Sequence, residues 1–228
     1  MAPNRIAALL VVTVLVPLAA RAQEAPTDRG VLLIMHGNAV VGREEFAVRR
    51  SGAAGPGGFT VASTAFYPAD RPEHVLTSVV ELGPDTLPSV ARLEIGNGEP
   101  LTVIIGIGPR RITVRRGTAT TESAREYPAR ERPMIVDDSV FAAFTVRPPA
   151  APGPKRALSL DGSLGNAVSV QNRGRSPTRI DTRTLELDAV ELEVGRETIT
   201  AWYDAAGRLI KLAWPARGIT VLREPEGP

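Results

Sequence analysis

The sequence predicts a mainly β protein, either a curved antiparallel sheet or an open half-barrel, with one short helix at about residues 137–146. Turn signals rich in Gly, Pro, Asn and Asp recur at short intervals along the chain. Between them, apolar and polar residues alternate, which is typical of antiparallel strands with one buried face. The chain contains no cysteine, so a buried core must stabilise it without disulfides.

The strands of the first half follow from turns on either side of them. His36-Gly37-Asn38 separates two alternating runs, and Gly96-Asn97-Gly98 is a strong hairpin signal because Gly and Asn tolerate positive φ. The run at 101–107 is almost continuously apolar and ends at Gly108-Pro109. The expected strands are 31–35, 40–48, 59–67, 74–82, 89–95, 101–107, 111–115 and 118–125.

The helix is predicted where the pattern changes. Asp137 or Asp138 can cap a helix start, and Val140, Phe141 and Phe144 then share one face. The proline-rich stretch that follows cannot continue a helix or a central strand. We therefore divide the chain after the leader into an N-terminal part at 23–147, a linker or crossing loop at 148–156, and C-terminal strands at 157–228 that we expect in the same domain.

The C-terminal part alternates again. Asp204-Ala205-Ala206-Gly207 predicts a tight turn between the last long strands, and Pro215 ends the strand before it. The expected strands are 157–160, 167–171, 179–190, 193–203, 208–214 and 218–223.

Residues 1–22 have the three parts of a secretory signal peptide. Arg5 precedes an apolar run at 6–20, and Ala20-Arg21-Ala22 gives a small-x-small cleavage site. Fifteen residues of helix extend roughly 22 Å, less than the hydrocarbon core of about 30 Å. We expect cleavage after Ala22, a periplasmic or secreted protein, and no membrane span after cleavage.

Charge argues against nucleic-acid binding. Cleavage would remove Arg5 and Arg21 from the 27 basic residues and none of the 25 acidic residues, so the two signs balance. Nucleic-acid-binding domains usually carry a clear basic excess. We therefore expect no nucleic-acid partner.

No catalytic or metal constellation stands out, and we expect no catalytic residues, metal or cofactor. A hydrolase could use His74 or His36 with Ser139 and Asp137 or Asp138, but Ser139 lacks the Gly-x-Ser-x-Gly elbow. Capping of a helix start explains the Asp and Ser residues more simply.

The aromatic residues are the best candidates for a ligand site. Phe141 and Phe144 lie on the expected helix, and Trp202 and Trp214 lie on the last hairpin. They could form the wall of an apolar cavity, or they could be ordinary core. Because Tyr203 follows Trp202, the two side chains must lie on opposite faces of a strand.

Several short motifs resemble exported bacterial proteins of unknown function. The run at 199–212, followed by Trp214-Pro215 and 221–224, resembles their closing hairpin, and 42–46, 77–82 and 136–141 are similar to earlier segments. This resemblance implies an antiparallel sheet curved around a helix, similar in shape to the open half-barrels of periplasmic lipoprotein carriers and lipid binders. It implies no activity and no catalytic residues.

Together these observations predict a non-enzymatic extracytoplasmic (periplasmic) protein that binds a hydrophobic small molecule, a lipid-like ligand or an envelope protein. Two alternatives remain open: an envelope hydrolase using His74 or His36, and a structural or interaction β domain without a cavity. A curved sheet that approaches closure can enclose a ligand.

Overall fold

A computed structural model describes residues 26–51, 56–96, 98–150, 153–180 and 182–225. The expected signal peptide at 1–22 lies outside these described residues. Within them, no helix has both the length and the apolar character needed to cross a membrane.

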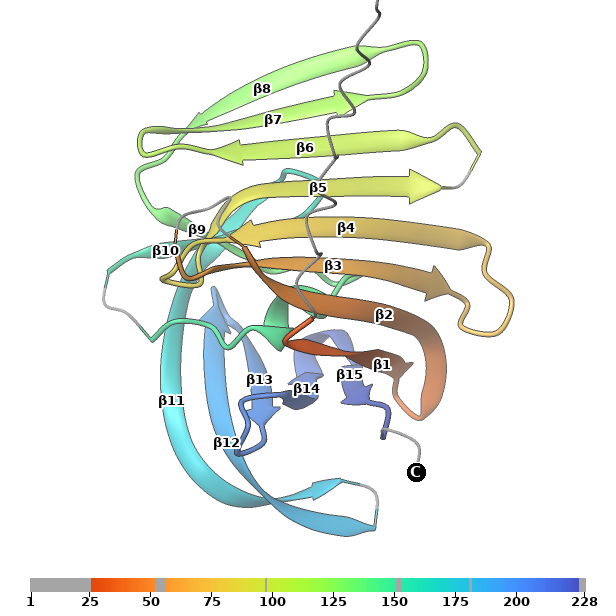
Figure 1. Cartoon of the computed structure of the whole chain (residues 1–228), viewed down its shortest axis with the longest axis vertical. Coiled ribbons are helices and arrows are strands. Elements are labelled where there is room, and N and C mark those ends of the chain that lie inside the picture. Colours follow the sequence, from red (N-terminus) through yellow and green to blue (C-terminus); the bar gives the residue numbers. More distant parts are fainter. Residues whose placement is uncertain (1–25, 52–55, 97, 151–152, 181, 226–228) are drawn as a thin grey trace, which may run out of the picture.

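The described residues form one large sheet, in the order β8-β7-β6-β5-β4-β3-β2-β1-β15-β14-β13-β12-β11-β10-β9. Figure 1 shows β3 to β8 stacked in the upper part, while the long β11 and β12 sweep around the lower part. The strands are β1 (Asp28–His36), β2 (Ala39–Ser51), β3 (Gly58–Tyr67), β4 (His74–Leu82), β5 (Pro88–Gly96), β6 (Leu101–Ile107), β7 (Arg111–Gly117), β8 (Glu122–Pro128), β9 (Arg132–Ile135), β10 (Lys155–Leu158), β11 (Leu164–Ile180), β12 (Arg183–Val194), β13 (Glu197–Tyr203), β14 (Leu209–Trp214) and β15 (Ile219–Arg223).

Neighbouring strands pair antiparallel throughout, except that β9 and β10 pair parallel. The first and last strands of the described residues pair in the middle of the sheet, where Leu33 of β1 lies opposite Leu222 of β15. Residues from both sides of the proline-rich stretch thus belong to one continuous sheet. The predicted antiparallel, curved β architecture is confirmed.

Alternating residues build the core on the inner face of this sheet. Leu32 and Ile34 of β1 are buried, as are Ile199, Ala201 and Tyr203 of β13. The period of two between buried positions is that of a strand with one face in the core. The inner face therefore consists mainly of aliphatic side chains.

One irregular segment crosses this inner face, and we name residues 136–146 the strap. Its regular part is a single 3₁₀ turn, η1 (Ala142–Thr145), so the short helix expected at 137–146 is confined to this turn. The reason is where the backbone N–H groups at the start of this segment donate their hydrogen bonds. The N–H groups of Val140, Phe141 and Ala142 donate to the carboxylates of Asp137 and Glu44, rather than to carbonyls four residues earlier.

Candidate functional site

Glu44 of β2 holds the strap from inside the core. Its carboxylate is fully buried and accepts hydrogen bonds from the backbone N–H of Phe141 (2.7 Å) and of Ala142 (3.1 Å). The Ser63 hydroxyl also bonds this carboxylate, and it lies 2.9 Å from the Ser78 hydroxyl. Burial raises the pKa of Glu44 to about 7, although these hydrogen bonds oppose the rise. Glu44 is therefore a buried acid that titrates near neutrality.

Asp137 fixes the start of the strap. Its Oδ1 accepts hydrogen bonds from the backbone N–H of Ser139 and Val140, and its Oδ2 accepts from the Ser159 hydroxyl and the Leu160 N–H. The predicted capping role of Asp137 therefore applies to a turn. The second oxygen ties that turn to the segment after β10.

Two tyrosines from the sheet hold the strap by its carbonyl groups. The Tyr67 hydroxyl donates to the Ser139 carbonyl at 2.6 Å, and the Tyr203 hydroxyl donates to the Phe144 carbonyl at 2.9 Å. Burial raises the pKa of both phenols, and the nearby Glu44 carboxylate raises that of Tyr67 further. Both phenols thus remain protonated donors. Gly42 makes room for the Tyr67 ring, which a Cβ at Gly42 would overlap.

Of the four aromatic residues predicted to form a cavity wall, three belong to the buried core and one lies outside it. Phe141 and Phe144 are fully buried in the strap, and Trp214 is buried with its Nε1 donating to Glu197. Trp202 lies on the opposite face of β13, where the Lys211 ammonium lies 5.2 Å from its ring centre. Phe144 lines a cavity of only about 20 Å³. A ligand contact at these residues stays a prediction.

The structure places the residues considered for a hydrolase in separate surroundings. The Ser139 hydroxyl donates to Asp138 at 3.2 Å, and Asp137 accepts the four hydrogen bonds given above. His36 lies at the exposed end of β1, against Gly218, and His74 is exposed at the start of β4. Within the described residues, no group of three or more His, Asp or Glu side chains could hold a metal ion.

A different region is hollow. The long hairpin β11–β12 curls below the ends of β14 and β15 (Figure 1), and a cavity of about 430 Å³ lies between them. We name it the hairpin cavity. Its lining combines apolar and charged side chains: Ile180, Thr182, Arg183, Leu185, Arg208, Ile210, Arg223, Glu224 and Pro225.

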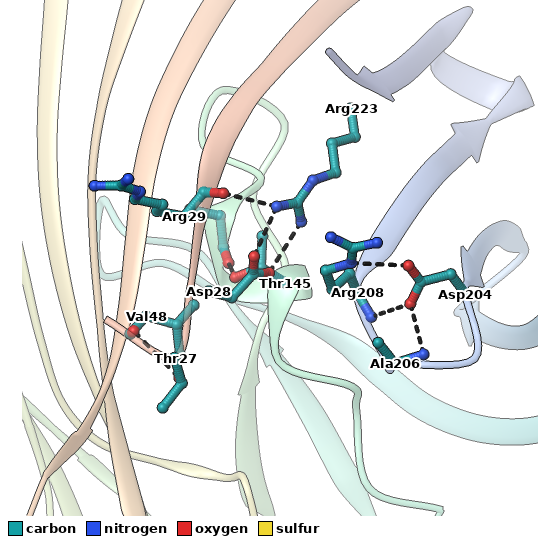
Figure 2. Close-up of polar contacts among 10 residues, drawn as sticks. Thr27, Asp28, Arg29, Val48, Thr145, Asp204, Ala206, Arg208 and Arg223 are labelled. Atoms are coloured by element: carbon teal, nitrogen blue, oxygen red, sulfur yellow. Dashed lines mark hydrogen bonds and ion pairs between the residues drawn. The ribbon is translucent and has the colours of Figure 1, made fainter. Parts of the chain in front are cut away.

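Arg223 is the most buried cation of this lining. Its guanidinium donates to both oxygens of Asp28, at 2.7 and 3.0 Å, and to the Arg29 carbonyl. The same group lies 5.2 Å from the centre of the Phe46 ring. Gly30 leaves the space that the guanidinium occupies, because a Cβ there would lie 3.2 Å from Nη2. Figure 2 shows this bidentate pair, a geometry that orients Arg firmly.

Arg208 is positioned in a similar way. Its Nε donates to Asp204 at 2.8 Å, while the other Asp204 oxygen accepts from the backbone N–H of Ala206 and Arg208. These hydrogen bonds, drawn in Figure 2, hold the pKa of Asp204 below its usual range against the opposing effect of burial. The turn between β13 and β14 therefore presents an oriented guanidinium to the cavity.

Sequence reasoning missed this cavity because its lining comes from three separate places in the chain. Ile180 and Leu185 lie on one hairpin, Ile210 lies on β14, and Arg223 ends β15. Sequence reasoning also made this hairpin too short: β11 spans Leu164–Ile180, whereas the expected strand covered only 167–171. A hairpin longer than its neighbours must curl or project beyond the sheet.

Comparison with known proteins gives a likeness of fold. The similar structure is a crystal structure described as a β-barrel-like protein of the domain of unknown function DUF1849, from Brucella abortus. The superposition covers 86% of this chain and 94% of the Brucella chain, with a TM-score of 0.51 and 8% sequence identity. This supports a β-barrel-like architecture shared with an uncharacterised protein. No family model matches the chain, and no curated protein matches it significantly.

Proposed function

We propose that this chain is a non-enzymatic, extracytoplasmic binding domain that holds an apolar or lipid-like ligand in the hairpin cavity. The observation that carries the proposal is the lining of that cavity, where Ile180, Leu185, Ile210 and Pro225 adjoin oriented guanidinium groups. Its volume of about 430 Å³ lies within the ~300–1,000 Å³ typical of small-molecule sites. A β-barrel-like neighbour of unknown function is compatible with such a role.

The strap favours the hairpin cavity as the ligand site rather than the centre of the sheet. In an open half-barrel that carries a lipid, the inner face would be the natural binding surface. Here Phe141, Ala142 and Phe144 already fill it, anchored by Glu44 and Tyr203. Displacing them would expose two phenylalanine rings, at a cost of roughly 1.5–3 kcal/mol each. A ligand that binds in the hairpin cavity does not incur this cost.

The ligand part of the proposal is tested by native mass spectrometry of protein purified from its own envelope, followed by titration with a fluorescent fatty acid. We expect a co-purifying small molecule and saturable uptake. The variant Leu185→Glu should weaken uptake at least tenfold, because it places a charge in the apolar lining. Leu185 is 37% exposed, so the variant should still fold.

Val90→Glu is the matched control. Val90 is an exposed apolar residue of β5, 42% exposed, outside the hairpin cavity, and its variant should bind like the parent. Ligand-free protein that takes up no fatty acid would refute the proposal. So would equal binding by the two variants.

The location part rests on the leader-like residues 1–22 and is tested separately. N-terminal sequencing of the protein from fractionated cells should give Gln23 as the first residue in the periplasmic or secreted fraction. Replacing Ala20 and Ala22 by leucine should block processing. Recovery of an uncleaved chain in the cytoplasm would exclude export.

A further inference from the structure

The charges of the hairpin cavity fall into two groups. Arg208 and Arg223 each lie against a carboxylate, Asp204 and Asp28 respectively. The lining also contains Arg183 and Glu224, which form no ion pair among the described residues. Both of these side chains are exposed, so they lie where the cavity meets solvent. The rim therefore carries one positive and one negative group that are not paired with each other.

This balance disfavours a ligand with a single charge. Counting Arg183, Arg208 and Arg223 against Asp28, Asp204 and Glu224, the described charges in and beside the cavity sum to zero. Described charges that balance in this way do not favour ions of one sign. A ligand with one charge would pair with one rim residue and be repelled by the other, whereas a head with both charges would pair with both.

We propose that the ligand of the hairpin cavity is a single-chain amphiphile with a zwitterionic head. Its apolar chain lies against Ile180, Leu185 and Ile210, its anionic group faces Arg183, and its cationic group faces Glu224. The volume, near the lower end of the range for small-molecule sites, suits one chain better than two. This inference rests on the proposed function, because it specifies the ligand of the same cavity.

The test is calorimetric titration with four amphiphiles that share one chain length, each below its micelle concentration. The probes are dodecylphosphocholine (zwitterionic), laurate (anionic), dodecyltrimethylammonium (cationic) and monolaurin (uncharged). We expect dodecylphosphocholine to bind about threefold to tenfold more tightly than the other three, as exposed ion pairs allow. If any of the other three binds as tightly, the inference is overturned.

Rim variants give a readout that a structural role would not produce. Arg183→Glu should make dodecyltrimethylammonium the tightest of the four, and Glu224→Lys should make laurate the tightest. Arg110→Glu, in the exposed turn before β7, is the control and should keep the parent's order. An unchanged order in both rim variants overturns the inference. Binding of all four without preference would overturn it and leave the proposed function standing, whereas binding of none would refute both.

Discussion

Glu44 makes the stability of this protein depend on pH in an unusual direction. Its pKa of about 7 in the folded state exceeds the ordinary value of 4.5 because burial disfavours the carboxylate. Between these values the unfolded chain releases the proton while the folded chain keeps it, so the free energy of unfolding should fall as pH rises. The expected loss from pH 4.5 to above pH 7 is roughly 3 kcal/mol, since each pKa unit corresponds to about 1.4 kcal/mol.

The comparison that isolates this effect is Glu44→Gln against the parent in urea unfolding at several pH values. The variant cannot ionise, so the difference in unfolding free energy between the two proteins should change across this window and be constant outside it. Other carboxylates with perturbed pKa values, such as Asp161 and Asp204, are shifted downward and cancel in the difference. A pH-independent difference would show that Glu44 does not titrate there.

Gly42 offers a second test at a single position. Gly42→Ala should destabilise the protein by about 1–3 kcal/mol, because the new Cβ would overlap the Tyr67 ring and disturb its hydrogen bond to Ser139. Gly106→Ala in β6 is the control, since a Cβ there meets nothing within 4 Å. That variant should be close to neutral. Equal melting temperatures for the two variants would mean that the ring moves aside freely.

At the scale of elements, the two tryptophans of the last hairpin should behave differently. Trp214 is 4% exposed and packs in the core, so Trp214→Ala should cost about 3–5 kcal/mol. Trp202 is half-buried on the outer face against Lys211, so Trp202→Ala should cost only about 1 kcal/mol. Chemical denaturation of both variants measures this contrast, and a larger loss for Trp202 would contradict the orientation of β13.

The strap shows why the helix expected at 137–146 was predicted with the right residues but the wrong length. Asp137, Val140, Phe141 and Phe144 have the residue types and spacing of a capped amphipathic helix. The capping hydrogen bonds do form, and both rings are buried. The regular part is shorter because Glu44, 97 positions before Phe141, accepts the N–H groups at its start. The parallel pairing of β9 with β10 was also missed, because residues 132–135 were not among the expected strands.

At the scale of the molecule, the sheet has an exposed edge at β8. This strand ends the strand order, and six of its seven residues are exposed. Two copies could pair antiparallel along this edge in a symmetric way. A pairing centred on residue 124 would place Glu122 opposite Glu126 of the other copy. A pairing centred on residue 125 or 126 would place Arg125 or Glu126, respectively, opposite the same residue of the other copy. Such like-charge contacts oppose edge-to-edge association.

Removing these charges should therefore promote association. The triple variant Glu122→Thr, Arg125→Thr and Glu126→Thr should form dimers or larger species at concentrations where the parent does not, as measured by light scattering after size exclusion. Arg92→Thr with Glu94→Thr on β5 is the control, since β5 already pairs with strands on both sides. Unchanged mass in the triple variant would show that the charges do not protect the edge.

The sequence by itself determined the local features of this protein. Turn signals on either side of it marked the strand expected at 31–35, the turn at 204–207 joined β13 to β14, and Trp202 and Tyr203 had to lie on opposite faces. Such features depend on residues close in the chain, because strand period and turn conformation are local properties.

Only the tertiary structure decided which distant segments come into contact. The pairing of β1 with β15, the anchoring of the strap by Glu44 and the lining of the hairpin cavity all join residues far apart in sequence. No local pattern encodes such contacts, since a buried carboxylate is stabilised only by donors that the fold brings to it. For the same reason, sequence reasoning did not point to the hairpin cavity.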